Sequence, residues 1–438
     1  MKLQSLIGHL HELLLMVRES TKPADSVIDS FFRKRKYLGS QERKFIATGT
    51  YGVLRHLRLC EHLLQKALAG HHKDMGYDDR MLLLIAAYLL KVANHQLSPD
   101  DVLQKIVSPS IKSYLPSLLE GLRQSELETQ DDLKKELALR YSYTDWMAEK
   151  IIKEYGGEAK QLCEAMNQQA PIQLRVNTVK TTLEECQKRL ARENIIAHQN
   201  PAIPNCLTLE KRINVFSLSA FKDGWFEMQD AGSQILPLLI DPKPTAKLLD
   251  ACAGAGGKTL EFAALMKNRG EIVAADIHSY RLDELRRRMK RAGVDTIRIK
   301  HVATLSDLER DHLEYFDIVF VDAPCSGSGT IRRNPGMKWS ITSDLVTTMA
   351  EKQLAILGQC VPLVKPQGRL VYATCSLFRD ENEDVVERFL NTHPEFECAP
   401  FSKLPALEGI ASPSLAYTLL PHRHNTDGFF CVSMLRKY

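Results

Sequence analysis

The sequence lacks the features of a secreted, membrane-bound or metal-stabilised protein. Its longest apolar run, Met81–Leu90, falls well short of the roughly 20 residues that a membrane-spanning helix needs. The N-terminus has no basic-then-apolar signal-peptide pattern. Its 10 cysteines are dispersed and include no Cys-x-x-Cys pair, which argues against a disulfide framework and a structural zinc site. We therefore expect a cytoplasmic protein with no metal site and no membrane contact.

The sequence also lacks a large excess of positive or negative charge. The formal net charge is only +4, and residues 1–140 carry the whole excess. Because there is no polybasic tail, contacts with nucleic acid must come from local patches. Candidates are residues 33–36, Arg55 with Arg58, and residues 286–291, although ordinary solvated helix faces would look the same. With no obvious oligomerisation segment, a monomer is the default expectation.

The apolar patterns divide the chain into three parts. Residues 1–140 repeat apolar side chains at helical spacing, which predicts an all-helical domain. Residues 141–240 begin as linker helices and continue as a small α/β module. Residues 241–438 alternate strand and helix patterns, which predicts a mainly parallel sheet covered on both faces. The predicted strands of the second and third parts lie at 172–177, 206–209, 247–251, 271–276, 296–301, 317–322, 368–374 and 428–434, and a helix is predicted at 182–193.

A glycine-rich turn follows the first strand of the third part. Its glycines permit a tight turn and close approach of a ligand to the backbone, and Asp276 ends the next strand at an offset suited to ribose hydroxyls. A phosphate-binding P-loop would need glycine where Cys252 stands, and a plain strand-to-helix turn is the remaining alternative. The candidate cofactor-binding residues are Cys252, Ala253, Gly254, Ala255, Gly256, Gly257, Lys258, Asp276 and Asp322.

Two cysteines, Cys325 and Cys375, follow the ends of predicted strands, and each precedes a serine. A thiolate can add to C6 of a pyrimidine, which makes C5 nucleophilic enough to attack a methyl sulfonium; the C5 proton must leave before the thiol is eliminated. This chemistry needs one nucleophile and one helper. Lys258 could favour the thiolate, and Asp322 could orient Lys258 or bond the base. The alternative for either cysteine is a buried small apolar residue.

Several motifs together carry a resemblance to one family. They are 174–178, 229–234, the glycine turn, 322–327, 372–376, 381–383 and 427–430. With them the chain resembles the RsmB/Nop2/Sun family of ribosomal RNA cytosine-C5 methyltransferases over nearly its whole length. The segment 331–339 is similar to the bacterial RsmB (Fmu/Sun) branch in particular.

The resemblance implies S-adenosylmethionine as methyl donor and 5-methylcytidine in small-subunit (16S) ribosomal RNA as product. It implies Cys375 as the nucleophile and Cys325 as the residue that assists product release. It also implies a NusB-like RNA-binding fold for residues 1–140, an RRM-like module within 141–240 and a class I, Rossmann-like methyltransferase domain at 241–438.

Two departures from the family pattern matter. Ala255 stands where the family usually has proline, which should loosen the turn slightly. Ala303 stands where the family has an adenine-binding carboxylate, a hydrogen bond worth roughly 1.5–3 kcal/mol, and Asp307 could substitute only in a rearranged loop. An RNA-binding assembly factor with weak turnover is therefore an alternative, as is the same chemistry on transfer RNA or large-subunit RNA.

Overall fold

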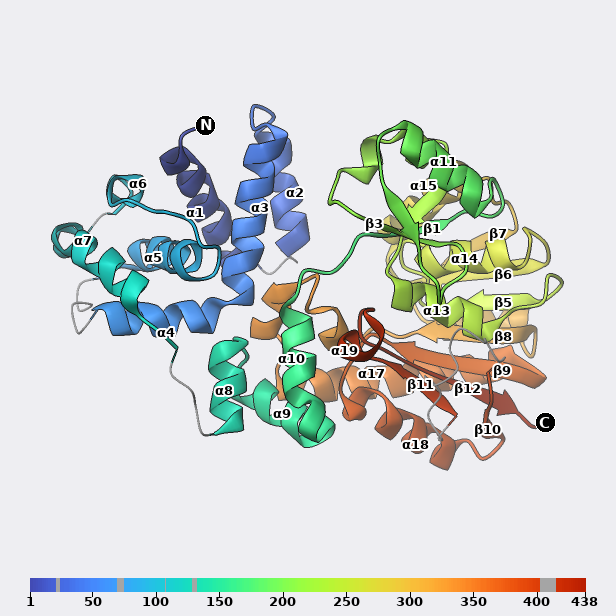
Figure 1. Cartoon of the computed structure of the whole chain (residues 1–438). Helices are drawn as coiled ribbons and strands as arrows, with labels where there is room; N and C mark the ends of the chain where they lie inside the picture. The colour runs from blue at the N-terminus through green and yellow to red at the C-terminus, as the bar shows by residue number, and fades with distance from the viewer. Residues whose placement is uncertain (21–23, 69–74, 107, 128–131, 402–414) are drawn as a thin grey trace. The chain divides into compact units, whose positions relative to one another are not determined.

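The computed structural model describes residues 1–20, 24–68, 75–106, 108–127, 132–401 and 415–438 (Figure 1). The parts of the predicted helical domain at 21–23, 69–74, 107 and 128–131 lie outside the described residues. The chain forms two compact units, Met1–Gln168 with Ile331–Thr342, and Gln169–Thr330 with Ser343–Tyr438. The predicted division into three parts at 140 and 240 stays a prediction. Among the described helices, none has the length and apolarity to cross a membrane.

All the secondary structure described in the first unit is helical, and residues 1–140, for which an all-helical domain was predicted, lie within it. Helix α5 (Tyr77–Lys91) is its centre, because residues 81–89 are all buried and a helix that is apolar all round must be surrounded. Helices α1, α3, α4 and α7 contact it. The other helices of the unit are α1 (Leu3–Glu19), α2 (Ala24–Lys34), α3 (Ser40–Arg55), α4 (Leu57–Leu68), α6 (Asp100–Leu103), α7 (Pro109–Gln124), α8 (Leu133–Arg140), α9 (Asp145–Tyr155), η1 (Gly156–Glu158) and α10 (Ala159–Asn167).

A short segment far along the chain completes the first unit. Ile331–Thr342 belongs to it, although the residues on both sides belong to the second unit. The segment contains the 3-10 helix η5 (Pro335–Trp339), in which the indole N–H of Trp339 donates to the carbonyl oxygen of Leu54 at 2.8 Å. Lys338 is fully buried there.

The second unit begins with a small antiparallel sheet in the order β2-β3-β1-β4. Its core includes Leu174 and Val176 from β1, with Leu190 from α11, and a capping box between Thr182 and Glu185 starts that helix. The prediction of strands at 172–177 and 206–209 and a helix at 182–193 is confirmed. The elements are β1 (Gln173–Val176), α11 (Leu183–Arg192), β2 (Ala197–Gln199), β3 (Cys206–Leu209), η2 (Val215–Ser217), α12 (Ser219–Lys222) and β4 (Phe226–Met228).

The larger sheet of the second unit has the order β10-β12-β9-β8-β5-β6-β7, and β11 pairs with β12. Strands β5 to β9 pair in parallel, whereas β12 is antiparallel to β9. The six predicted strands of this region are confirmed, and β10 and β11 were not predicted. The strands are β5 (Lys247–Asp250), β6 (Glu271–Asp276), β7 (Ile297–His301), β8 (Phe316–Asp322), β9 (Val364–Thr374), β10 (Phe396–Ala399), β11 (Ala416–Leu419) and β12 (Phe429–Arg436).

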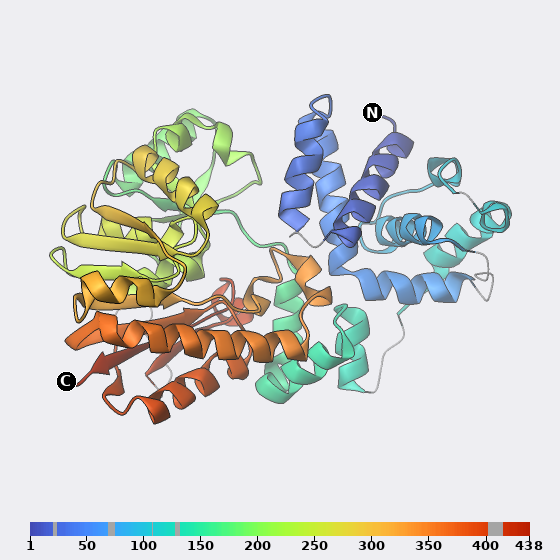
Figure 2. The ribbon, with the colours of Figure 1, turned by 180° about the vertical axis from the view of Figure 1, so that it is seen from behind.

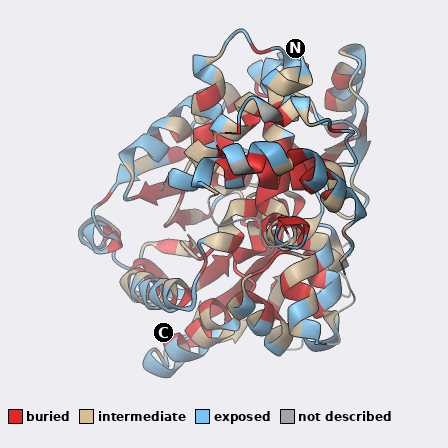
Figure 3. Cartoon of the chain, turned by 90° about the vertical axis from the view of Figure 1, so that its left-hand side faces the viewer, coloured by how far each residue is buried: buried red, intermediate tan, exposed pale blue. Residues whose placement is uncertain are grey.

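Helices cover both faces of this sheet, because its central strands alternate apolar residues between two cores. Leu248 packs with α13, α14 and α15, whereas Leu249 packs with α17 and α18 on the other side (Figure 2). The strands are accordingly mostly buried (Figure 3). The elements between the strands are α13 (Ala231–Ile240), α14 (Gly257–Leu265), α15 (Ser279–Ala292), η3 (Leu305–Leu308), α16 (Glu309–His312), η4 (Ser328–Thr330), α17 (Ser343–Cys360), η6 (Val361–Leu363), η7 (Arg379–Glu381), α18 (Glu383–Thr392) and α19 (Pro421–His424).

Candidate active site

One edge of the larger sheet collects the predicted site residues. Four neighbouring parallel strands, β9, β8, β5 and β6, end there at Thr374, Asp322, Asp250 and Asp276. The carboxyl ends of parallel strands form the usual ligand-binding crevice of such sheets. The register sets Asp322 opposite Ala373, so the two cysteine loops leave adjacent strands at almost the same level.

The structure brings the two predicted thiols into contact. The Sγ atoms of Cys325 and Cys375 lie 3.3 Å apart, and both side chains are half-buried. The hydrogen bond with Cys375, together with burial, raises the pKa of Cys325 well above its ordinary value. In contrast, Cys60, Cys163 and Cys360 are buried core residues.

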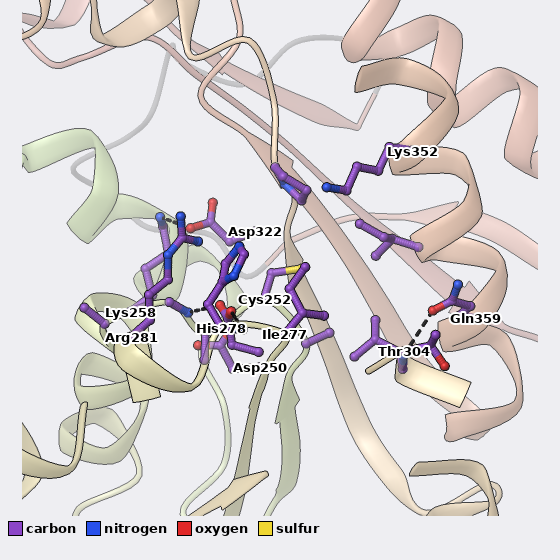
Figure 4. Close-up of a pocket in the computed structure, with 18 of the residues that line it drawn as sticks. Asp250, Cys252, Lys258, Ile277, His278, Arg281, Thr304, Asp322, Lys352 and Gln359 are labelled. Atoms are coloured by element: carbon purple, nitrogen blue, oxygen red, sulfur yellow. Dashed lines mark hydrogen bonds and ion pairs between the residues drawn. The ribbon is translucent and has the colours of Figure 1, made fainter. Parts of the chain in front are cut away.

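Lys258 and Asp322 form an ion pair at this edge, as expected from their positions. The Nζ–Oδ2 distance is 2.6 Å, and the side chains are 11% and 30% exposed respectively. Burial alone would lower the pKa of Lys258, but the charge of Asp322 and its hydrogen bond raise it above its ordinary value. Figure 4 shows Lys258 beside Asp322. Lys258 therefore stays an ammonium at neutral pH.

The glycine turn is held in its shape by Asp276. Gly254 and Gly256 have φ angles of +55° and +82°, and a Cβ at Gly256 would lie 2.1 Å from Cδ1 of Leu285, so glycine is required there. The Oδ2 atom of Asp276 accepts from the backbone N–H of Gly254 at 2.9 Å, and its Oδ1 accepts from that of His278 at 2.7 Å.

A cavity of about 650 Å³ opens beside this turn (Figure 4). It is lined by the predicted residues Cys252, Ala253, Gly254, Ala255, Gly257, Lys258, Asp276 and Asp322. Gly256 is buried against Leu285. The cavity lies between this turn and a wall that includes Thr304 and Gln359.

Asp250, which the sequence reasoning missed, also lines the cavity. Its Oδ2 atom accepts from the hydroxyl of Thr259 at 2.6 Å, but its buried Oδ1 has no hydrogen-bond partner among the described residues. Burial raises the pKa of Asp250 to about 7. A buried carboxylate oxygen without a donor fits a ligand that brings an ammonium or hydroxyl group.

Two arginines brace the glycine turn from outside. Arg288 donates to the carbonyl oxygen of Ala255 at 2.8 Å, and Arg175 donates to that of Gly257 at 3.4 Å. Arg288 also pairs with Glu227 at 3.0 Å, as Arg291 does at 2.5 Å. These two members of the predicted basic patch at 286–291 therefore hold the fold together, and the turn has tertiary support at the alanine that replaces proline.

Strand β7 and the turn after it bring no carboxylate to the lining of the cavity. Ala303 lines it, and Asp307 accepts from the backbone N–H groups of Ala303 and Thr304 at 2.8 and 3.0 Å, which lowers the pKa of Asp307. Asp307 is thus used within its own turn. Gln359 of α17 lines the cavity instead, and its Oε1 accepts from the backbone N–H of Leu305 at 3.1 Å.

Comparison with known proteins agrees with this architecture. Residues 237–435 match the family model described as 16S rRNA methyltransferase RsmB/F, and residues 143–216 match the ferredoxin-like domain of RsmF/B-like methyltransferases. The larger sheet with its helices is thus a Rossmann-like methyltransferase domain, and the small antiparallel sheet lies in a ferredoxin-like domain.

Relatives of similar length are known. The chain is 31% identical over 427 residues to a probable ribosomal RNA small subunit methyltransferase B of Synechocystis, covering 94% of each chain. It is 29% identical to a protein of the same description from Bacillus subtilis, covering 97% of each. The crystal structure of PH0851 superposes with a TM-score of 0.82 at 27% identity, covering 99% of both chains.

Proposed function

We propose a specific reaction for this chain, which belongs to the RsmB/F family of 16S rRNA methyltransferases: it methylates C5 of a cytosine in small-subunit ribosomal RNA. S-adenosylmethionine is its cofactor. The observation that carries the proposal is the pair of thiols 3.3 Å apart at the sheet edge that also holds the glycine turn and Lys258. A methyltransferase acting on a more nucleophilic atom would have no use for two adjacent thiols.

The pair of thiols can divide the work. The sequence resemblance assigns Cys375 as the nucleophile, and it assigns Cys325, whose Sγ lies 3.3 Å from that of Cys375, as the residue that assists product release. Cys375 bonds to C6 of the cytosine, and the electron pair that develops at C5 would take the methyl group from the sulfonium, whose S–CH₃ bonding electrons stay on the sulfur. Cys325 then assists removal of the C5 proton. The C5–H electrons re-form the C5–C6 double bond, and the Cys375–C6 bond breaks with its electrons returning to sulfur.

The cofactor site is fitted to the proposed donor. S-adenosylmethionine supplies an electrophilic methyl group, and Asp250, Asp276 and the glycine turn are the groups that would hold it. The unsatisfied Oδ1 of Asp250 suits the α-amino group of the methionine part, and Asp276 suits the ribose. Lys258 and Asp322 would orient and charge-balance the cytosine beside Cys375.

We also propose that residues 1–140 bind RNA as a NusB-like domain, that residues 141–240 are linker helices and a small α/β RNA-binding module, and that residues 241–438 are the catalytic part. The support is the sequence resemblance together with the helical fold and the location of the excess positive charge in residues 1–140.

A covalent trap tests the reaction. We expect Cys325→Ala, incubated with S-adenosylmethionine and small-subunit ribosomal RNA, to accumulate an RNA–protein adduct that survives a denaturing gel. Cys375→Ala should give neither adduct nor methyl transfer, and Cys398→Ala, which alters another half-buried cysteine, should behave as the wild type. Labelled 5-methylcytidine in digested RNA would identify the product.

The same assay separates the alternatives. Adduct formed only with transfer RNA or large-subunit RNA would contradict the small-subunit assignment. Exchanged phenotypes of the two cysteine variants would reverse their roles. No adduct and no methyl transfer, with RNA binding intact, would favour an assembly factor.

A further inference from the structure

Glu381 is a fully buried carboxylate that lies behind the two cysteine loops. It ends η7, between β9 and α18, and is outside the cavity beside the glycine turn. The reaction proposed above gives it no role. Its carboxylate is nevertheless surrounded by donors from both loops, and this arrangement indicates what it does.

Each carboxylate oxygen of Glu381 binds the residue that follows a cysteine. Oε1 accepts from the backbone N–H of Ser326 at 2.7 Å, and Oε2 accepts from the hydroxyls of Ser326 and Ser376, each at 2.5 Å. Ser326 follows Cys325 and Ser376 follows Cys375. One side chain therefore ties the two loops to each other directly after the two thiols.

The neighbours of Glu381 extend this tie. Gln353 of α17 donates from Nε2 to Oε1 of Glu381 at 3.1 Å and to the carbonyl oxygen of Pro324 at 3.0 Å. The Tyr372 hydroxyl lies 2.5 Å from the carbonyl oxygen of Glu381. Asn382 donates to the carbonyl oxygen of Ser376 at 3.1 Å. The donors to the Glu381 carboxylate named here are neutral, so the tie is a hydrogen-bond network rather than an ion pair.

The two loops need such a connection because they leave the sheet differently. Cys375 directly follows the last residue of β9, whereas Ala323 and Pro324 separate Cys325 from the end of β8. The pairing of β8 with β9 therefore does not by itself fix the distance between the thiols. A misplacement of about 1 Å in a reacting group can cost about 10²-fold in rate.

We propose that Glu381 is a positioning residue that sets the separation of Cys325 and Cys375 by binding the serine after each. This inference rests on the proposed function for the two thiols. Glu381 touches neither RNA nor cofactor in this assignment. It acts through Ser326 and Ser376. Its carboxylate is required because the backbone N–H of Ser326 and the hydroxyls of Ser326 and Ser376 all donate to it.

The decisive variant is Glu381→Gln, which keeps the shape but replaces one acceptor oxygen by an NH₂ donor. We expect kcat to fall about 10²-fold, with KM for RNA and for S-adenosylmethionine within about threefold of the wild type. Glu383→Gln is the matched control, because it makes the same change two residues away, on a half-buried residue at the start of α18. It should retain wild-type kcat.

A second measurement reports thiol proximity without any methyl transfer. The oxidant diamide accepts the two thiol hydrogens as Cys325 and Cys375 join in a disulfide, and mass spectrometry of the linked peptide gives the rate. We expect Glu381→Gln to slow this step about tenfold or more, whereas Glu383→Gln leaves it unchanged. A residue that only supports the fold would not change this rate in a variant whose thermal unfolding is unaltered.

The double variant Ser326→Ala/Ser376→Ala tests the route and also serves if Glu381→Gln does not fold. It should reproduce both losses, and adding Glu381→Gln to it should cost little more. Unchanged kcat and disulfide rate in either variant would overturn the positioning role while the Cys325→Ala adduct still supported the reaction. Conversely, a slowed disulfide step in a protein that gives no adduct would leave Glu381 as a positioning residue and remove the proposed function.

Discussion

Two lysines, the half-buried Lys258 of the second unit and the fully buried Lys338 of the first, are held by different partners. Lys258 of the second unit faces the carboxylate of Asp322 at 2.6 Å, and its pKa is raised. Lys338 of the first unit is fully buried and donates to carbonyl oxygens of Arg55 and Tyr141, at 3.1 and 2.7 Å, and to the side-chain oxygen of Asn167. Burial lowers the pKa of Lys338 well below its ordinary value.

The difference shows what each lysine is suited for. A full opposite charge holds an ammonium through neutral pH, which is what a reaction centre needs. Carbonyl dipoles and the ring of Tyr143, 4.2 Å from Nζ of Lys338, offer directional bonds but no compensating charge. Lys338 therefore serves as an anchor that attaches Ile331–Thr342 to the helices of the first unit.

The largest expected effect comes from removing the charged lysine. Lys258→Met should reduce methyl transfer by about 10²-fold or more, because a preorganised charge at a reaction centre contributes on this scale. Circular dichroism and the urea midpoint should stay close to those of the wild type. Methyl transfer within a few-fold of wild type would show that the ion pair with Asp322 is structural, as Lys338 is.

The matching change at the anchor should act on stability. Lys338→Met leaves two carbonyl oxygens and one amide oxygen without their buried donor, and we expect the first unit to lose about 2–4 kcal/mol of unfolding free energy. Urea denaturation followed by the fluorescence of Trp339 would measure it. A loss below about 1 kcal/mol would indicate that the acceptors find other donors.

A smaller effect, on the pH dependence of stability, is expected from giving Lys338 a carboxylate partner like the one that Asp322 provides for Lys258. The folded-state pKa of Lys338 is lowered, so between that pKa and about 10.5 the unfolded chain binds more protons and stability rises with pH, by at most about 1.4 kcal/mol per unit. Asn167→Asp should raise the pKa of Lys338 and flatten this rise. Denaturation of wild type, Asn167→Asp and Lys338→Met from pH 7 to 9 tests it; an equal slope in all three would exclude Lys338 as the titrating group.

Much of the larger sheet and of its candidate site could be predicted, because the sequence patterns that mark them are local. Apolar runs of strand length, punctuated by glycine and aspartate, located β5, β6, β8 and β9, and the residues just after them lie together because parallel strands end at one edge. That rule places Cys325 and Cys375 at the same edge, but it does not set the 3.3 Å between their sulfur atoms. Strands β2 and β4, of three residues each, are too short to show a periodicity.

Other parts of the site depend on contacts between residues distant in sequence. The acceptor role of Glu381 and the brace from Arg288 to Ala255 have no local pattern, since their partners lie on other elements, and Oδ1 of Asp250 is left without a donor by the surroundings that the fold gives it. For the same reason the basic patch at 286–291 resembled an RNA contact, although Arg288 and Arg291 bind Glu227.

The sequence by itself located the candidate reactive groups of this protein: two thiols, a glycine turn and an aspartate at or just after strand ends, and a lysine at the start of the helix that follows the turn. The tertiary structure decided which charged groups are paired, that burial lowers the pKa of Lys338, and that Ile331–Thr342 belongs to the helical unit. The physical reason is that local backbone preferences act over a few residues, whereas desolvation and hydrogen bonding depend on whatever side chains the completed fold brings together.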